Sequence, residues 1–145
     1  MNIEIKKMTK EHLHNIQDIL QEQFDEFWNA NVLDKELENP LSDYIVAIEE
    51  GEVIGYAGLW QPIDEGHVTN IVTKKDKRGN HIGSKMLEEI IKLAKNKNLK
   101  CVTLEVNEHN EAAIKLYKKY NFIEIGKRKK YYNNTDDAII MTLEF

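Results

Sequence analysis

One segment is especially informative about the fold, namely Lys77-Arg78-Gly79-Asn80-His81-Ile82-Gly83-Ser84. It follows Glu65–Thr73, a run rich in β-branched residues that is typical of a strand. It leads into Asn80–Lys95, where apolar residues recur at helical spacing. A turn between a strand and a helix start is a common anion site, because unpaired backbone N–H groups and the helix dipole both face it. The stretch therefore indicates a phosphate-binding loop.

The residues in and before this loop are compatible with phosphate binding but do not establish it. Gly79 and Gly83 let the backbone approach a ligand closely. Positive charge comes from Lys74, Lys75, Lys77 and Arg78. The pattern is neither a Walker loop nor the dinucleotide motif G-x-G-x-x-G. From these residues alone, a phosphate loop and a tight turn before a surface helix with solvated lysines are equally favoured.

Outward from the loop, apolar spacing predicts an alternation of strands and helices. The predicted strands cover residues 3–6, 43–48, 53–60, 65–73, 101–106, 122–125 and 138–143. The predicted helices cover residues 9–24, 29–40, 80–95 and 110–120. Thr9 caps the first helix, Pro40 breaks the second, and Asn121 ends the last in a left-handed conformation. Glu49–Glu52 forms the turn of an antiparallel hairpin.

These elements predict a single α/β domain over residues 1–145, because no linker, repeat or low-complexity tract divides the chain. The antiparallel strands come first. A parallel pair then flanks the helix over residues 80–95, and we expect a right-handed connection between its two strands.

The composition predicts a soluble, cytoplasmic protein. Of the 145 residues, 41% are hydrophobic and 31% are charged. No apolar run approaches the roughly 20 residues of a membrane span, and the N-terminus lacks a secretory signal. The single cysteine, Cys101, excludes an internal disulfide and fits a reducing compartment. The net charge of −5 argues against general nucleic-acid binding. It suits a cationic polypeptide partner and, equally, mere solubility.

Several separate segments, in order, carry a resemblance to a known family. They are Gly55–Trp60, Glu65–Ile71, Arg78–Ser84, Leu104–Val106, Asn110–Tyr117 and Tyr131–Met141. The chain resembles the GNAT superfamily of N-acetyltransferases, whose acetyl-CoA loop follows the pattern Gln/Arg-x-x-Gly-x-Gly/Ala. The resemblance implies a mixed, mostly antiparallel central sheet of roughly six to seven strands with a splayed parallel pair, flanked by about four helices.

The resemblance also implies that the cofactor is acetyl-CoA. It places the pyrophosphate on Arg78, Gly79, Asn80, His81, Ile82, Gly83 and Ser84, and the pantetheine arm along Ile71, Val72 and Thr73. Asn110 and Tyr117 are further implied contacts, although Asn110 also stands where a helix N-cap is wanted. His81 departs from the family pattern, which has glycine there, and this difference bears on cofactor affinity. No set of His, Cys, Asp and Glu residues has metal-ligand spacing, so we predict no metal.

Acetyl transfer to an amine needs a base for the nitrogen and an acid for the leaving thiolate. The resemblance implies that Glu105 is the base and Tyr117 the acid, with direct transfer in a ternary complex. Alternation along the strand sets Glu105 opposite Leu104 and Val106. The residues alone favour a non-catalytic reading of Glu105, as a glutamate at a strand end whose carboxylate is hydrogen-bonded by neighbours. Tyr117 equally fits a core position. Cys101 has no histidine in its motif and is predicted to be a small core residue.

Within the superfamily, the chain resembles the ribosomal-protein-alanine N-acetyltransferases, which modify the N-terminal alanine of ribosomal protein S18. Trp60, Tyr131 and Tyr132 are then the expected substrate-binding residues, with acidic Asp64 and Glu65 nearby. These residues also have explanations without a substrate. The acidic pair can belong to a solvated turn, and the aromatic residues can form a cluster that packs on the sheet. Two other functions stay open, which are acetylation of a small amine or lysine side chain and noncatalytic binding of acyl-CoA. We expect a monomer or weak dimer that binds no nucleic acid directly and no membrane.

Overall fold

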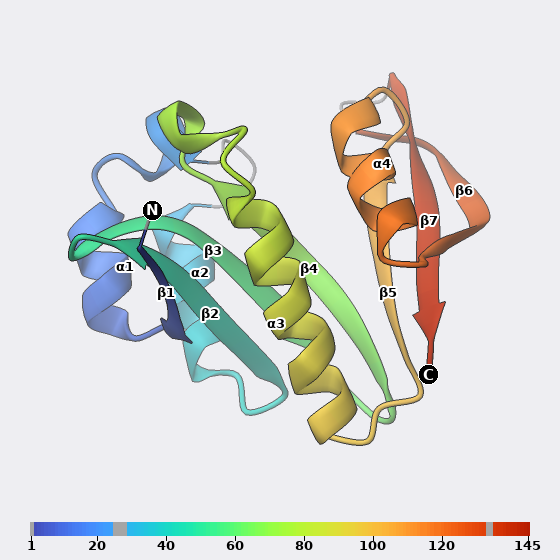
Figure 1. Ribbon diagram of the computed structural model, residues 1–145, viewed down its shortest axis with the longest axis horizontal. Helices are drawn as coiled ribbons and strands as arrows, with labels where there is room; N and C mark the ends of the chain where they lie inside the picture. The colour runs from blue at the N-terminus through green and yellow to red at the C-terminus, as the bar shows by residue number, and fades with distance from the viewer. Residues whose placement is uncertain (1, 25–28, 133–134) are drawn as a thin grey trace. The chain divides into compact units, whose positions relative to one another are not determined.

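The computed structural model describes residues 2–24, 29–132 and 135–145, except for the side chains of residues 130–132. Its elements, in chain order, are β1 (Ile3–Lys7), α1 (Lys10–Ile16), the π-helix η1 (Leu20–Phe24), α2 (Ala30–Glu38), β2 (Ser42–Glu49), β3 (Glu52–Trp60), β4 (Glu65–Thr73), the 3-10 helix η2 (Lys75–Lys77), α3 (Ile82–Asn96), β5 (Cys101–Asn107), α4 (Glu111–Lys119), β6 (Ile123–Tyr132) and β7 (Asp136–Glu144). The strands form a seven-stranded sheet in the order β1-β2-β3-β4-β5-β7-β6 (Figure 1). β4 and β5 pair in parallel through Glu65–His67 and Cys101–Thr103, at the start of each strand. The predicted mixed, mostly antiparallel sheet with one parallel pair is confirmed.

Contacts between residues divide the chain into two compact units. The first unit comprises residues 1–60 and 69–93, and the second comprises residues 61–68 and 94–145. β4 and α3 contribute residues to both units. The single domain predicted over residues 1–145 stays a prediction.

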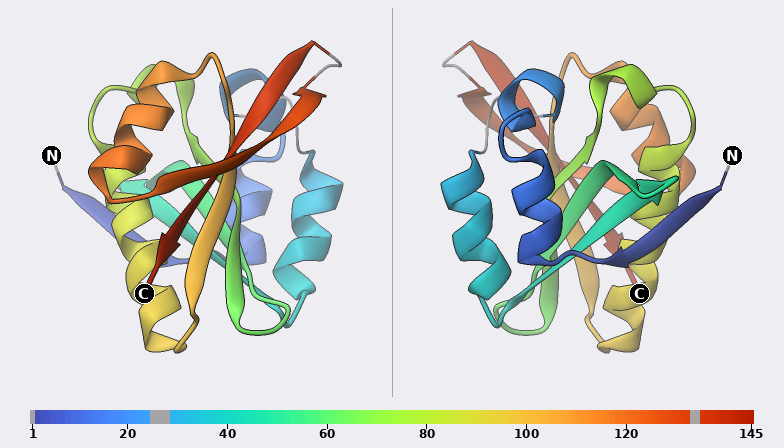
Figure 2. Two further views of the ribbon diagram at one scale, coloured as in Figure 1. Left: turned by 90° about the vertical axis from the view of Figure 1, so that its right-hand side faces the viewer. Right: turned by 90° about the vertical axis from the view of Figure 1, so that its left-hand side faces the viewer.

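The first unit buries its core against both faces of the β2–β3 hairpin. On one face, a cluster combines the strand residues Tyr44, Val46, Val53, Tyr56 and Val72 with the helical residues Leu13, Ile16, Leu20, Phe24 and Leu33. On the other face α3 approaches closely, because a Cβ on Gly55 would lie 3.0 Å from Met86 Cε. Figure 2 shows α1 and α2 on one side of these strands and α3 on the other. Burial on both faces explains why β3 is apolar along nearly its whole length.

Short polar side chains begin α1 and α4 and follow the end of α4, as their positions in the sequence predict. Thr9 Oγ1 accepts a hydrogen bond from the N–H of His12, whose ring accepts one from the N–H of Thr9. Asn110 Oδ1 accepts from the N–H of Ala113 at the start of α4. Asn121, just after α4, has the expected left-handed backbone, with φ of +72°.

The helix predicted over residues 9–24 is interrupted. α1 ends at Ile16, and the chain becomes helical again as the π-helix Leu20–Phe24. A bond from the N–H of Ile19 to the carbonyl of Ile16 spans three residues and tightens the turn between the two helices. Leu20 and Phe24 are still buried, so the apolar spacing predicted their burial correctly and the type of helix wrongly.

The β2–β3 turn is shorter than predicted. The strands extend through Glu49 and Glu52, which pair with each other, and leave only Glu50 and Gly51 in the turn. Both turn residues have positive φ, +50° and +79°, as a two-residue hairpin requires. Gly51 meets this requirement without strain, because it has no Cβ.

In the second unit, β7 lies between β5 and β6 and pairs antiparallel with both. α4 lies along one side of this ladder (Figure 1). β6 and β7 are longer than the predicted strands 122–125 and 138–143. The added part of β6, residues 126–132, contains the charged run Lys127–Lys129. This run shows no apolar alternation and is held in the sheet by the pairing of β6 with β7.

None of the helices within the described ranges combines the length and the apolar character that a bilayer crossing requires.

Candidate functional site

The predicted phosphate loop forms the start of α3 in the first unit. Arg78–His81 are exposed, and the backbone is left-handed at Gly79 (φ +84°) and at His81 (φ +62°). The N–H of Lys85 donates to the carbonyl of His81, so the helix begins two residues later than the predicted start at Asn80. The N–H groups of Ile82, Gly83 and Ser84 consequently have no acceptor within the helix. This end of α3 offers the donors and dipole that bind an anion.

Two of the four predicted loop cations are engaged elsewhere in the first unit. Lys74 Nζ donates to Glu52, and Lys77 Nζ lies 2.8 Å from Glu49 Oε1. The hydrogen bond from Lys74 lowers the pKa of Glu52, and the one to Glu49 raises the pKa of Lys77. The prediction that all four supply charge to the loop is therefore wrong, because hairpin carboxylates neutralise these two.

Replacing His81 by glycine is expected to stabilise the folded chain by up to about 1 kcal/mol. A left-handed backbone costs a residue with a Cβ about 1–2 kcal/mol, and the greater freedom of glycine in the unfolded chain offsets part of the gain. Urea unfolding followed by circular dichroism measures the difference. Asn98→Gly is the control, since Asn98 is also left-handed (φ +58°) and follows α3. It should gain less, because asparagine tolerates this conformation better. Lower stability of His81→Gly would show that the imidazole makes a stabilising contact.

The second unit carries a row of polar side chains along β5. Thr103, Glu105 and Asn107 alternate with the buried residues Leu104 and Val106, and this alternation was predicted for Glu105. Each has a polar partner across the sheet: Thr103 Oγ1 lies 3.0 Å from Thr142 Oγ1, Glu105 pairs with Arg128, and Asn107 Nδ2 donates to Asp136 Oδ2 at 3.0 Å. Glu105, the predicted base, thus has an ordered place on the polar face of this strand.

The two carboxylate oxygens of Glu105 are in different surroundings. Oε1 lies 3.1 Å from a guanidinium nitrogen of Arg128 on β6. Oε2 is buried and accepts no hydrogen bond from any residue that the structure describes. Arg128 could not be predicted as a partner of Glu105, because nothing in the sequence indicates that only β7 lies between β5 and β6.

The predicted acid and the predicted cofactor asparagine are both on α4. Tyr117 is buried, and its ring centroid lies 5.8 Å from that of Phe122 at an interplanar angle of 57°. This contact agrees with the core position that the sequence also allowed. The side-chain oxygen of Asn110 caps α4, so its contact with a cofactor stays a prediction.

A hydrogen-bonded chain crosses from β2 to β4 in the first unit. Tyr44 Oη lies 2.8 Å from Thr69 Oγ1, which donates to Asn70 Oδ1 at 3.3 Å. Burial raises the pKa of Tyr44 far above its ordinary value, so its hydroxyl stays protonated. Asn70 Nδ2 is buried and finds no acceptor among the described residues. Asn70 was not among the predicted site residues. It directly precedes Ile71, Val72 and Thr73, the residues predicted to line the pantetheine arm.

The residues predicted to bind substrate are only partly described. Trp60 is exposed at the end of β3, while the side chains of Tyr131 and Tyr132 lie outside the described residues. Asp64 is paired with Lys100 at 2.9 Å, which lowers the pKa of Asp64, and Glu65 accepts a hydrogen bond from Cys101 Sγ.

Cys101 is buried, and its thiol is not suited to be a nucleophile. Burial, and then the hydrogen bond to Glu65, raise its pKa and disfavour the thiolate. The predicted core role of Cys101 is confirmed.

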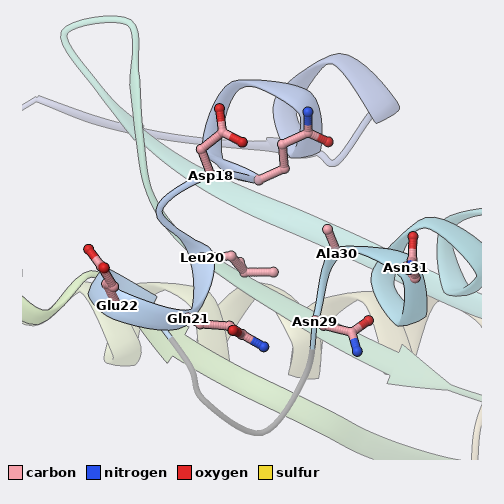
Figure 3. Close-up of a pocket in the computed structure, with 8 residues that line it drawn as sticks. Asp18, Leu20, Gln21, Glu22, Asn29, Ala30 and Asn31 are labelled. Atoms are coloured by element: carbon pink, nitrogen blue, oxygen red, sulfur yellow. The ribbon is translucent and has the colours of Figure 1, made fainter.

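A cavity of about 410 Å³ opens between the end of α1 and the start of α2 (Figure 3). Its lining residues are Gln17, Asp18, Leu20, Gln21, Glu22, Asn29, Ala30 and Asn31. Carboxylates and carboxamides without a cation do not suit an anionic ligand, so this cavity is not the phosphate site. No group of three or more His, Cys, Asp or Glu residues in the described ranges is arranged to hold a metal ion.

Comparison with known proteins identifies the family. A family model described as the acetyltransferase (GNAT) family matches residues 13–122, more than half of the chain. The chain is a GNAT acetyltransferase.

This GNAT acetyltransferase is similar to proteins that are named for N-terminal acetylation of the alanine of ribosomal protein S18. It is 34% identical over 139 residues to a Bacillus subtilis protein named as a candidate ribosomal protein bS18-alanine N-acetyltransferase, covering 94% of this chain and 92% of that protein. It also matches the crystal structure of the ribosomal-protein-S18-alanine N-acetyltransferase of Escherichia coli, with a TM-score of 0.89 and 25% identity over 99% of this chain and 94% of that one.

A third match supports the fold of the GNAT acetyltransferase. It is a GNAT-family acetyltransferase from Elizabethkingia anophelis, solved with acetyl-CoA bound, at a TM-score of 0.78 and 23% identity over 99% of each chain. The predicted family, fold and N-acetyltransferase activity are confirmed, and the family uses acetyl-CoA. The roles of individual site residues stay predictions.

Proposed function

We propose that this GNAT acetyltransferase transfers the acetyl group of acetyl-CoA to the N-terminal alanine of ribosomal protein S18. The likeness to the Bacillus subtilis protein carries the proposal, since it extends over 94% of this chain and 92% of that protein at 34% identity. The net charge of −5 is compatible with a basic acceptor peptide, and its attraction would weaken with added salt.

The start of α3 fits a pyrophosphate. The N–H groups of Ile82, Gly83 and Ser84 point out of the helix end, and Arg78, which precedes the helix in the same loop, is exposed. Around Gly79, no atom beyond its two chain neighbours lies within 4 Å of the place a Cβ would occupy, so the loop surface there is open to a ligand. These residues would hold the two phosphates of acetyl-CoA, which supplies the acetyl group as a thioester.

Glu105 and Tyr117 of the second unit would move the protons. Glu105 takes a proton from the α-ammonium group, whose pKa is about 7.7–8.0 and which is mostly protonated at neutral pH. The nitrogen lone pair then bonds to the acyl carbon, and the C–S bond breaks with its electron pair going to sulfur. The Tyr117 hydroxyl gives its proton to that sulfur, and solvent returns the proton from Glu105 to Tyr117. The products are the acetylated peptide and coenzyme A.

An acceptor competition tests this proposal. The purified chain is incubated with acetyl-CoA and a short S18-like peptide that begins with alanine, and released thiol and acetylated peptide are both measured. The same peptide with a blocked N-terminus is the control, because it keeps the charge of the tail and lacks the reacting amine. A lysine peptide and a polyamine are offered separately.

We expect turnover of the free peptide and none of the blocked one. Turnover of the polyamine or the lysine peptide alone would replace the ribosomal acceptor by a small amine or a lysine side chain. Binding of acetyl-CoA without turnover of any acceptor would instead indicate a noncatalytic acyl-CoA-binding module.

A further inference from the structure

Arg128 reaches Glu105 across an intervening strand. Arg128 on β6 is in register with Ala138 of β7, and Glu105 on β5 is in register with Ile140 of the same strand. Ala138 and Ile140 are two residues apart, so all four side chains share one face of the sheet. The small side chain of Ala138 leaves room for the guanidinium to pass over β7. The nitrogen thereby comes within 3.1 Å of Glu105 Oε1.

This pairing makes the two oxygens of Glu105 unequal. Oε1 is occupied by the guanidinium, whereas Oε2 is buried and accepts no hydrogen bond from the described residues. A buried polar atom without a partner is unfavourable, by about 1–3 kcal/mol for typical groups and more for charged ones. Oε2 is thus the oxygen of this ordered side chain that the guanidinium leaves without a partner.

We propose that Arg128 is a positioning residue for the acetyl-transfer reaction. Its guanidinium fixes Glu105 by Oε1 and leaves Oε2 as the atom that takes the proton from the acceptor amine. The proposal rests on the proposed function, since it assigns Glu105 the role of base.

The solvent exposure of the Arg128–Glu105 ion pair distinguishes a positioning role of Arg128 in catalysis from a role in stabilising the fold. The side chain of Arg128 is 54% exposed and that of Glu105 is 26% exposed. Solvent screens such a pair, and exposed ion pairs contribute little to the free energy of unfolding. Loss of Arg128 should therefore leave the fold intact and change turnover, whereas a structural residue would show the opposite.

The test is a double-mutant cycle in the full chain, with Arg128→Met and Glu105→Gln made singly and together. We expect Arg128→Met to lower kcat about 10-fold, to change the KM for the acceptor less than about 2-fold and to leave the melting temperature unchanged. In the Glu105→Gln background, Arg128→Met should have no further effect on kcat. Arg128→Lys should recover part of the activity, because lysine keeps the charge without the planar fork.

Lys127→Met is the matched control. Lys127 is the neighbouring cation on β6, and its register with Ile139 puts it on the opposite face of the sheet. An equal fall in kcat for Lys127→Met would show a general effect of charge and overturn the proposal. So would an undiminished effect of Arg128→Met in the Glu105→Gln background.

The outcomes also separate this proposal from the proposed function. Activity on the alanine peptide without coupling between Arg128 and Glu105 would overturn the positioning role and leave the function standing. Activity on a small amine alone, with the coupling present, would overturn the ribosomal acceptor and support the positioning role. Absence of turnover with every acceptor would overturn both.

Discussion

Glu105→Gln is expected to lower kcat about 100-fold near pH 6.5 and much less near pH 9. An α-amino group with a pKa of about 7.8 is roughly 5% neutral at the lower pH and more than about 90% neutral at the higher one. Without its base, the enzyme can use only the acceptor molecules whose amine is already neutral. The rate of the variant should therefore rise about 20-fold across this range. Glutamine keeps the shape of the side chain and an oxygen that can accept from Arg128, so a structural loss is not expected.

The measurement is kcat for an alanine-initiated peptide across that pH range, with released thiol as the readout. Glu124→Gln is the control, because Glu124 is an exposed carboxylate on the neighbouring part of the same sheet and in register with Met141. It should behave as the wild type. A pH profile of Glu105→Gln that runs parallel to that of the wild type would remove Glu105 from the role of base.

Gly58→Ala is expected to lower the free energy of unfolding by about 3 kcal/mol, at the upper end of the usual range for overpacked cores. Gly58 is in register with Tyr44, whose ring lies directly over it. A Cβ at this position would lie 2.3 Å from Tyr44 Cζ and 2.6 Å from Thr69 Oγ1. Tyr44 is only 3% exposed and has no space to withdraw into, so the core around it must shift.

Thermal unfolding followed by circular dichroism should show the melting temperature fall by roughly 10 °C. Gly126→Ala is the matched control, since the nearest atom to its added Cβ would be Ile140 Cδ1 at an ordinary contact distance of 3.8 Å. It should change stability by less than about 1 kcal/mol. Equal melting temperatures for Gly58→Ala and the wild type would contradict the close contact of Tyr44 with β3.

Features of the fold that depend on neighbouring residues could be predicted from the sequence. Thr9 and Asn121 act through bonds and backbone angles within a few residues, and both behave as expected. The predicted start of α3 was two residues too early, because His81 adopts a left-handed backbone that its residue type does not require. The charged half of β6 was missed for a different reason, since pairing with β7 holds it in the sheet.

The candidate site could be predicted residue by residue and not as a set of contacts. Glu105 was found through its place on a strand and a family resemblance. Its partner Arg128 was not, since the contact depends on β7 lying between β5 and β6. Lys74 and Lys77 were assigned to the loop by their nearness in sequence, yet they pair with carboxylates of the β2–β3 hairpin. Strand order and ion pairing between distant segments are tertiary facts that local patterns do not contain.

The interleaving of the two units fixes an order in which they can form during synthesis. The first unit needs residues up to 93, whereas the second needs residues 61–68 together with the chain as far as its last strand. A growing chain emerges N-terminus first, so the first unit can complete its core while the start of β4 still has no β5 to pair with. That short segment stays an unpaired strand edge until β5 emerges, and a pause in synthesis once residue 93 has left the ribosome would prolong its exposure to wrong partners.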